Sequence, residues 1–393
     1  MPRLRVGFVS TYPPIHCGVG EYTKLLATAL ASSNEVDVFI LAEESVGRGS
    51  FDGYSGAAVI PSFRRADEQS FDRVLDALAD VGGVDVLHIQ HEYGIFGRGI
   101  GIIEKALEAR EEGLARRVVF TLHTVYHSEA SGEARAFQRR VVEASDAVIV
   151  HSNLQEHELQ MEVGGYPSNL HRIPHGTSLN PYLDTPRRAL AGSLGLEPDS
   201  LRGLVVSVIG FLRRDKGIDT LLEALDTIES GRHRLSRPLT VIVAGEPRDP
   251  ALLESLRIHE GGTLRLMARY LSTPEILKLS ALSDAIVLPY RDAPGIYSVS
   301  GILHLSMGSL KPVIGTNTPR LTELYTLAPR LVIRAGDSEA LARMLSLLSD
   351  PDYYELTVAY AGPLYSYAVR TSWSRMARRH LRLYNKLLAQ GRP

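Results

Sequence analysis

The sequence predicts a chain of two α/β domains, each built on a Rossmann-like, doubly wound parallel sheet. First, short β-branched or apolar runs alternate with segments of helical spacing, which is the pattern of βαβ units. Second, the alternation pauses over residues 181–200, which are rich in Pro, Gly, Asp and Ser, and then restarts. Third, glycine-rich and polar loops follow several runs, at the sheet edge where open parallel sheets bind ligands.

Each predicted domain contains five strand-like runs. In the first domain they are residues 5–9, 36–41, 84–89, 118–122 and 147–150, with a helix expected over 22–30. In the second domain they are residues 204–209, 239–244, 285–288, 312–315 and 331–333, with helices expected over 218–225 and 302–307. Strands separated by helix-length segments predict parallel sheets that are buried on both faces.

The composition is that of an ordinary globular protein and excludes several classes. Of the 393 residues, 44% are hydrophobic and 22% are charged, and the formal net charge of −2 argues against a general nucleic-acid binder. The single cysteine, Cys17, excludes an internal disulfide and a multi-cysteine zinc site. Because no run of about 18 apolar residues and no signal-peptide pattern occur, we expect a cytoplasmic protein.

The net charge is unevenly divided along the chain. No acidic residue follows Glu355, whereas seven basic residues do: Arg370, Arg375, Arg378, Arg379, Arg382, Lys386 and Arg392. Residues 371–388 carry apolar side chains at spacings of three and four, namely Trp373, Met376, Ala377, Leu381, Tyr384 and Leu388. This spacing predicts an amphipathic helix whose apolar stripe packs on the protein while its cations stay exposed.

Polar residues and glycines follow the strands predicted in the first domain. Gly18 and Gly20 come after the first strand, where glycine allows a tight turn and the close approach of a ligand. The segment is neither G-x-G-x-x-G nor a P-loop, which disfavours a dehydrogenase or a P-loop enzyme. After two further strands come the candidate site residues His91, Glu92, His123 and Tyr126. Burial in the core would explain any one histidine, but several polar groups at successive strand ends favour a site, and the absence of H-E-x-x-H disfavours a metal.

A cationic turn follows the first strand of the second domain. Gly210 begins this turn, Arg213 and Lys216 lie within it, and the helix expected from residue 218 comes next. Cations beside a helix N-terminus favour an anion site. A second candidate phosphate contact is formed by Ser298, Ser300 and Gly301, although a serine at such a helix start is also an ordinary N-cap.

These motifs resemble the retaining glycosyltransferases of family four, which have the GT-B architecture. The resemblance rests on Gly-Phe-Leu-Arg-Arg-Asp-Lys-Gly at 210–217, Lys-Pro-Val-Ile-Gly-Thr at 311–316, His-x-Gln-His-Glu at 88–92, Thr-Leu-His-Thr at 121–124 and Ile-Pro-His-Gly at 173–176. It covers nearly the whole chain in the family's order. It implies an N-terminal acceptor domain over residues 1–180 and a C-terminal nucleotide-sugar donor domain over 181–370. These domains would face each other across a cleft, and a helix over 371–393 would return to the first domain.

The resemblance also implies a role for each matching residue. Lys216 corresponds to the lysine that binds the donor diphosphate, and His123 to the histidine beside the transferred sugar. Phe211 stands where the family has a partner arginine, so Arg213 becomes the nearest substitute. The remaining donor-site assignments are Gly18 and Gly20 on the cleft floor, Gly210, Glu246, the nucleobase loop Arg269, Tyr270 and Leu271, and the phosphate contacts Ser298, Ser300 and Gly301. The acceptor would meet His91, Glu92 and Tyr126.

One departure from the family concerns two glutamates that lie eight positions apart in its other members. Counted from Lys311, these positions fall at Tyr297 and Leu305, and neither residue is acidic. Contacts to the sugar hydroxyls and the ribose must then come from other residues, and the candidates are Glu246 and Asp292.

The resemblance implies transfer of a hexose from a nucleotide-sugar to an acceptor hydroxyl, with retention at the anomeric carbon and without a metal or other cofactor. GDP-mannose is the favoured donor, because the strings at 91–97 and 121–124 are similar to those of mannosyltransferases, while UDP-glucose stays open. The alternatives are a catalytically inactive nucleotide-sugar-binding regulatory protein and a GT-B phosphorylase or epimerase.

The basic end of the chain suggests a membrane surface as a further partner. Together with Arg135, Arg139 and Arg140, its cations could meet anionic lipid headgroups at about 1 kcal/mol each. We therefore expect a peripheral enzyme at the inner face of the membrane, a lipid-linked or glycan acceptor, and no nucleic-acid partner.

Overall fold

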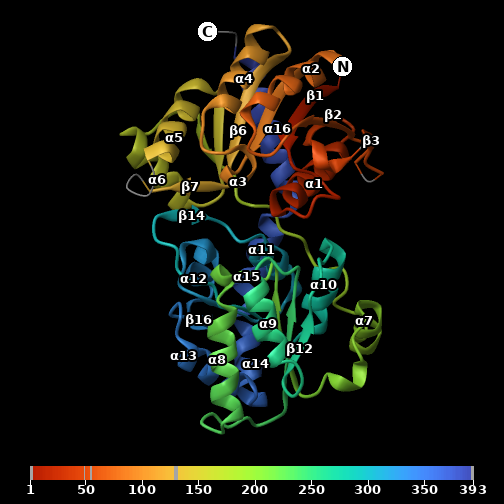
Figure 1. Ribbon diagram of the computed structural model, residues 1–393, viewed down its shortest axis with the longest axis vertical. Coiled ribbons are helices and arrows are strands. Elements are labelled where there is room, and N and C mark those ends of the chain that lie inside the picture. The colour runs from red at the N-terminus through yellow and green to blue at the C-terminus, as the bar shows by residue number, and fades with distance from the viewer. Residues whose placement is uncertain (1–2, 48, 54, 128–131, 391–393) are drawn as a thin grey trace. The chain divides into compact units, whose positions relative to one another are not determined.

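The computed structural model describes residues 3–47, 49–53, 55–127 and 132–390, so the predicted cation Arg392 lies outside the described residues. The contacts divide the chain into two compact units (Figure 1). Unit 1 consists of Met1–Gly176, Gly295–Val299 and Trp373–Pro393, and unit 2 consists of Thr177–Pro294 and Ser300–Ser372. The predicted divisions after residues 180 and 370 lie within four residues of two of these boundaries.

Unit 1 is built on an eight-stranded sheet with the order β3-β4-β2-β1-β5-β6-β8-β9. All neighbours in this sheet run parallel except β3 and β4, and a separate antiparallel pair joins β7 to β14. The strands are β1 (Leu4–Ser10), β2 (Val36–Glu43), β3 (Ser50–Phe51), β4 (Ala58–Phe63), β5 (Val84–His91), β6 (Ala115–Leu122), β7 (Thr124–Tyr126), β8 (Ala147–Val150), β9 (Leu170–Arg172) and β14 (Ile296–Ser298).

Helices cover both faces of this sheet because successive strand residues point to opposite sides. Val86 of β5 packs in one apolar cluster with α1 and α16, whereas Leu87 and Ile89 pack in the other with α2, α4 and α5. The helices of unit 1 are α1 (Gly18–Ala31), α2 (Asp72–Asp80), α3 (Tyr93–Phe96), α4 (Gly101–Glu111), α5 (Gly132–Ala144), α6 (Asn153–Val163) and α16 (Trp373–Ala389).

Helix α16 is the predicted amphipathic helix, and in Figure 1 it lies in blue beside the red and orange elements of unit 1. It packs against α1, with Trp373, Met376 and Tyr384 in the shared apolar cluster. The buried stripe differs slightly from the prediction. His380, Leu383 and Leu387 are buried, while Leu381 and Leu388 are only partly covered.

Unit 2 is built on a six-stranded parallel sheet with the order β12-β11-β10-β13-β15-β16. The strands are β10 (Leu204–Ile209), β11 (Leu239–Ala244), β12 (Leu264–Met267), β13 (Ala285–Leu288), β15 (Val313–Thr316) and β16 (Val332–Ile333). The helices are α7 (Arg187–Leu194), α8 (Ile218–Glu229), α9 (Pro250–Ile258), α10 (Thr273–Leu282), α11 (Gly301–Ser306), α12 (Thr322–Leu327), α13 (Ser338–Leu348), α14 (Pro351–Ala359) and α15 (Ala361–Arg370).

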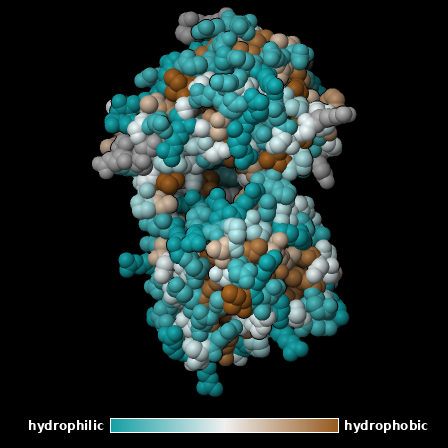
Figure 2. All heavy atoms as spheres, viewed as in Figure 1, coloured by the Kyte–Doolittle hydropathy of each residue, from teal (hydrophilic) through white to brown (hydrophobic). Residues whose placement is uncertain are grey.

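The core of unit 2 also lies on both faces of its sheet. Val206 and Val208 of β10 pack with α8 and α13, and Val205 and Ile209 pack with α7 and α10. On the face seen in Figure 2, hydrophilic residues predominate and hydrophobic residues form small separate groups. The apolar residues of the strands are therefore buried inside each unit.

Four predicted strands have the observed bounds: β8, β10, β11 and β13. The other predicted strands differ by one to three residues at an end. The sequence did not predict six strands: β3, β4, β7, β9, β12 and β14. Pro61 interrupts β4, and the other five are only two to four residues long. Among the described residues, no helix is both long and apolar enough to span a lipid bilayer.

Candidate active site

The predicted site residues are divided between the strand ends of unit 1 and those of unit 2, and the residues of unit 1 are described first. Gly18 and Gly20 lie in the first turn of α1, directly after the loop that follows β1. A Cβ atom on Gly20 would lie 3.3 Å from the backbone of Thr11 and Tyr12, so glycine allows the loop and helix to approach closely. Gly18 has open space around it and is exposed.

His123 follows β6 and is held by a chain of buried hydrogen bonds. Its Nε2 lies 2.9 Å from Oε1 of Gln90, and Nε2 of Gln90 lies 3.3 Å from Nε2 of His88. The amide nitrogen of Gln90 can only donate, so Nε2 of His88 accepts from it and from the hydroxyl of Thr121 at 2.8 Å, while Nδ1 of His88 donates to the hydroxyl of Tyr384 at 2.7 Å. The amide oxygen of Gln90 can only accept, so Nε2 of His123 donates to it, and Nδ1 of the neutral His123 ring is unprotonated.

The environment of His123 keeps its ring neutral. Burial lowers the pKa of His123 well below its usual range, and His151 and His91 lower it further. The ring packs edge-on against Tyr22 with centroids 4.8 Å apart. Tyr22 also contacts the rings of His151, His175 and Trp373, at centroid distances of 5.0 to 5.1 Å. One ring cluster thus forms around the strand ends. Its members are Tyr22 of α1, Trp373 of α16, and the histidines that follow β6, β8 and β9, namely His123, His151 and His175.

The structure corrects the prediction that His91 contacts the acceptor. Strand β5 continues to His91, and the side-chain alternation places His91 on the same face as Leu87 and Ile89. The ring is fully buried and stacks on Phe137 at 4.0 Å and on Phe96 at 5.7 Å. Burial lowers the pKa of His91 to about 3. His91 is therefore a neutral core residue.

Glu92 and Tyr126 lie at the same edge but are partly engaged within unit 1. The carboxylate of Glu92 accepts a hydrogen bond of 2.7 Å from the hydroxyl of Thr124. Tyr126 belongs to β7, and its ring packs edge-on against Tyr93 at 4.9 Å. Both side chains are only partly buried, so they can still contact a bound molecule.

Lys216 occupies a tight turn in unit 2. It ends the 3-10 turn η4 (Arg214–Lys216), and Gly217 at φ 66° connects this turn to α8. A Cβ on Gly217 would collide with the backbone oxygen of Pro289, so only glycine fits. The ammonium of Lys216 lies 3.9 Å from the centroid of the Tyr290 ring, and within the described part of the chain no carboxylate pairs with it. It is available to an anion.

Arg213 differs from Lys216 because it already has an acidic partner. Its guanidinium pairs with Asp215 at 2.8 Å, and Arg320 pairs with the same carboxylate at 2.7 Å. Burial alone would raise the pKa of Asp215, but Arg213, Arg320 and Lys216 outweigh it and hold that pKa below its usual range. The predicted role of Arg213 at the diphosphate would require it to share its charge with Asp215.

The residues after β10, β11 and β12 form an aromatic and charged group. Phe211 lies 6.2 Å from Tyr270 between ring centroids, and the guanidinium of Arg248 lies 4.9 Å from the Phe211 ring. Glu246 pairs with Arg248 at 3.3 Å. In the predicted nucleobase loop, Arg269 pairs with Glu275 at 2.7 Å, and the side chain of Leu271 is buried in the core. Leu271 can therefore offer a ligand only its backbone.

The predicted second phosphate contact is divided between the two units. Ser298 belongs to β14 of unit 1, where it pairs with Thr124, whereas Ser300 and Gly301 belong to unit 2. The hydroxyl of Ser300 is the N-cap of α11, accepts from Leu303 N at 3.2 Å and bonds to the Tyr290 hydroxyl at 3.0 Å. Only 3% of Ser300 is exposed. The structure thus corrects the prediction for the Ser300 side chain, which has a capping role.

Tyr297 and Leu305 occupy the two positions that are glutamates in other family members, and both side chains pack in apolar surroundings. Tyr297 packs against the apolar core of unit 1 from β14, and Leu305 is buried in the core of unit 2. Asp292 is exposed in the loop before β14. Gly210, at φ 125°, closes the end of β10, and a Cβ there would lie 3.3 Å from Ile302.

Sequence reasoning missed several residues that support these groups. They are Gln90, His88, Tyr384 and Tyr22 around His123, and Tyr290 and Arg320 around the cationic turn. The string His-x-Gln-His at 88–91 was a usable signal, because alternate residues of a strand share one face. The contribution of Tyr384 comes from a helix 296 residues further along the chain, so no local pattern indicates it.

Two Rossmann-like parallel sheets, with a C-terminal helix that packs on the first, are the two halves of a GT-B fold. Each half has its own match among protein families. Residues 17–180 match Glycosyltransferase Family 4, and residues 203–350 match Glycosyl transferases group 1. Each half of the chain therefore matches a glycosyltransferase domain family, and the predicted GT-B fold class is confirmed.

Curated relatives are identical to the chain at about a quarter of the aligned positions. A glycogen synthase of Acidiphilium cryptum (strain JF-5) is 27% identical over 215 residues, which cover 52% of this chain and 42% of the relative. A D-inositol 3-phosphate glycosyltransferase of Jonesia denitrificans is 27% identical over 194 residues, which cover 44% of this chain and 45% of the relative. The matches thus span less than half the length of these relatives.

Solved structures match over nearly the whole chain. The sucrose-phosphate synthase of Thermosynechococcus elongatus has a TM-score of 0.75 at 18% identity, over 98% of this chain and 100% of that one. Anabaena Alr3699/HepE in complex with UDP has a TM-score of 0.72 at 16% identity, over 98% and 100% of the two chains. At these identities the likeness establishes the fold.

Proposed function

We propose that the protein is a retaining glycosyltransferase that moves a hexose from a nucleoside-diphosphate donor to an acceptor hydroxyl. The observation that carries this proposal is Lys216, which pairs with no carboxylate of the described residues and lies in a turn that admits only glycine at the next position. The chemistry requires stabilisation of a diphosphate leaving group, and preorganised cations and free helix N–H groups supply it. In the proposed reaction Lys216 and the N-terminus of α8 have this role, and no metal takes part.

A variant of Lys216 tests this proposal against a matched neighbour. Lys216→Ala should lower the release of nucleoside diphosphate from the donor at least a hundredfold, because one preorganised charge contributes about 3 kcal/mol to such a transition state. Arg214→Ala is the control, since Arg214 lies in the same turn but pairs with Asp249 at 2.7 Å. An undiminished rate in Lys216→Ala would refute the assignment.

His123 is the proposed contact to the transferred sugar. Its hydrogen-bonded Nε2 fixes the ring, and its unprotonated Nδ1 accepts a hydrogen bond from a sugar hydroxyl. No carboxylate nucleophile is required in this scheme, because the acceptor attacks the same face that the leaving diphosphate departs from. The departing phosphate oxygen takes the acceptor proton, the new glycosidic bond forms, and the bond from the anomeric carbon to the phosphate oxygen breaks.

The aromatic pair Phe211 and Tyr270 is the proposed support for the nucleobase. Flat aromatic rings at a strand end stack on bases of any identity. Glu246 and Asp292 are the proposed replacements for the family's two glutamates at the sugar and the ribose. Gly18, Gly20, Gly210 and Gly301 supply close backbone approach, while Arg269, Tyr270 and Leu271 offer backbone groups to the base.

Mannose from GDP-mannose stays the proposed donor on the resemblance of residues 91–97 and 121–124 to mannosyltransferases. UDP-glucose is the rival donor, because one solved neighbour is in complex with UDP and another is a sucrose-phosphate synthase. A thermal-shift panel of nucleotide-sugars decides between them, since only the true donor stabilises the folded chain by binding.

The proposed acceptor is a lipid-linked or membrane glycan, reached from the inner face of the membrane. The support for this proposal is the exposed basic side of α16, with Arg375, Arg378, Arg379, Arg382 and Lys386. The arginines of α5 contribute less than the sequence suggested. Arg135 and Arg139 pair with Glu162, and Arg140 pairs with Glu104.

The apolar packing of Tyr297 and Leu305 favours one rival function, a nucleotide-sugar-binding protein without transfer activity. This rival predicts donor binding with no release of nucleoside diphosphate, whatever acceptor extract is added. Release that depends on an acceptor would exclude the rival.

A further inference from the structure

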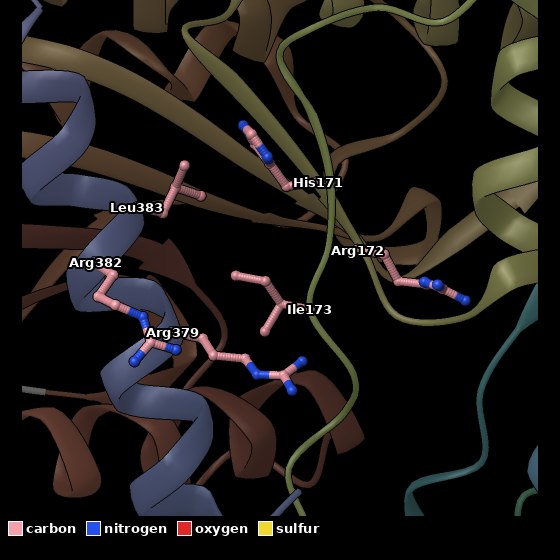
Figure 3. Close-up of a pocket in the computed structure, with 6 residues that line it drawn as sticks. All are labelled: His171, Arg172, Ile173, Arg379, Arg382 and Leu383. Carbon is pink, nitrogen blue, oxygen red and sulfur yellow. The ribbon is translucent and has the colours of Figure 1, made fainter.

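A cation-rich pocket lies in unit 1 between the edge strand β9 and helix α16 (Figure 3). Its volume is about 380 Å³, and it is lined by His171, Arg172, Ile173, Arg379, Arg382 and Leu383. Ile173 and Leu383 are buried and form an apolar floor. No lining residue is acidic. Arg379 lies six residues beyond Trp373, about 9 Å along the helix. Ile173 joins the pocket to the ring cluster around His123, because its backbone carbonyl lies 3.0 Å from Nδ1 of His151.

The arginines of the pocket differ in whether they have partners. Arg172 pairs with Glu156 at 3.2 Å, and in Figure 3 its guanidinium points away from α16. Arg379 and Arg382 extend from α16 on the side of Ile173. Across the described residues, neither of these two guanidinium groups has an ion pair or a hydrogen bond to another side chain.

Helix α16 also concentrates like charges. It contains no acidic residue, and its basic residues fall in three pairs four positions apart: Arg375 with Arg379, Arg378 with Arg382, and Arg382 with Lys386. Like charges at this spacing destabilise a helix by a few tenths of a kcal/mol per pair. A bound anion relieves this repulsion. The arginines of α5 contrast with those of α16, because Arg139 and Arg140 already pair with Glu162 and Glu104.

We propose that this pocket binds a phosphoryl group, held by Arg379 and Arg382, which are not among the residues of the proposed donor site. Two guanidinium groups can each form paired hydrogen bonds to phosphate oxygens, which is the geometry that arginine offers and lysine does not. His171 lies half-buried at the same wall and adds a ring nitrogen. Burial, and then the charge of Lys386, lower the pKa of His171, so near pH 7 it contributes a neutral hydrogen-bonding group.

The test measures binding of inorganic pyrophosphate by isothermal titration calorimetry at constant ionic strength. The full chain carries Lys216→Ala throughout, which removes the candidate diphosphate site of unit 2 from the measurement. Failure of the proposed transferase function therefore does not affect this result. We expect R379Q/R382Q to bind pyrophosphate at least tenfold more weakly than its parent.

The matched control is R375Q/R378Q, which removes two charges from the exposed side of the same helix but none from the pocket lining. It should bind pyrophosphate within threefold of the parent. Both pairs are exposed, and neither has a partner among the side chains of the described chain, so both variants should fold.

Vesicles distinguish a lipid headgroup from a soluble phosphate ester as the source of the phosphoryl group. Co-sedimentation with phosphatidic acid vesicles, but not with phosphatidylcholine, that is lost in R379Q/R382Q and kept in R375Q/R378Q assigns a lipid. Pyrophosphate binding without co-sedimentation assigns a soluble ester. Equal losses in the two double variants, or no binding to either probe by the parent, would overturn the proposal.

Discussion

The buried histidines of unit 1 should make its stability unusually sensitive to mild acid, and His91 offers the cleanest test. In His91→Leu, a side chain of similar size replaces a ring that is fully buried and stacked on Phe96 and Phe137. Neither ring nitrogen of His91 has a hydrogen-bond partner among the described residues. The substitution therefore removes a titrating group without breaking a hydrogen bond.

The expected magnitude follows from the pKa of His91 in the folded and unfolded chains. Burial lowers the folded pKa to about 3, whereas an unfolded histidine titrates near about 6.5. Above pH 6.5 neither state binds the proton. As the pH falls below that value, only the unfolded chain becomes protonated, so stability is lost. Between pH 7.5 and 5.5 this loss is about 1.4 kcal/mol for His91 alone.

Urea unfolding at pH 7.5 and 5.5 measures this difference. Trp373 is the single tryptophan and belongs to unit 1, so its fluorescence reports the unfolding of that unit. The loss of unfolding free energy between the two pH values should be about 1.4 kcal/mol smaller in His91→Leu than in the parent. His157→Leu, at an exposed position on α6, is the control and should keep the parent's pH dependence. An unchanged pH dependence in His91→Leu would refute the reasoning.

Three further substitutions test the site. Gln90→Leu removes the hydrogen-bond partner of Nε2 of His123, whereas Nε2 of His88 keeps the hydroxyl of Thr121 at 2.8 Å, so we expect a loss of about 2 kcal/mol in urea unfolding and a lower kcat at unchanged KM. A parent-like kcat would contradict the role of the Gln90 link. Phe211→Ala removes a stacking surface worth about 1–3 kcal/mol, so calorimetry should show nucleoside-diphosphate affinity at least fivefold weaker; unchanged affinity would exclude the aromatic support. Gly217→Ala forces a Cβ against the Pro289 carbonyl at positive φ, and its melting temperature should fall by several degrees, whereas a parent-like value would show that the turn tolerates a side chain.

The strand interiors were predictable because a strand that is buried on both faces of its sheet requires a continuous run of apolar residues. The runs at β8, β10, β11 and β13 are short, apolar and bounded by turns, and their ends match the structure. The exposed cations of α16 were also predictable from helical spacing. The exact set of buried residues on α16 was not predictable. Packing against α1 buries Leu383 more than Leu381, and the sequence spacing alone does not fix how the helix is rotated about its axis.

The site was predictable where it depends on strand ends and not where it depends on side-chain direction. Lys216 and His123 follow strands and lie where the sequence placed them within their own units. His91 was misjudged because β5 continues two residues beyond the predicted end, which turns its ring into the core. Ser300 was misjudged because the cap of a short helix and the hydroxyl of Tyr290 already use its oxygen.

In the proposed function the turn at Lys216 holds the second phosphate of a nucleoside diphosphate. Calorimetric titration of GDP against GMP, and of UDP against UMP, measures the contribution of that phosphate directly. We expect one diphosphate to bind at least tenfold more tightly than its monophosphate, Lys216→Ala to abolish this preference and Arg214→Ala to retain it. Equal affinity for diphosphate and monophosphate, or a preference that survives in Lys216→Ala, would show that Lys216 does not hold the second phosphate.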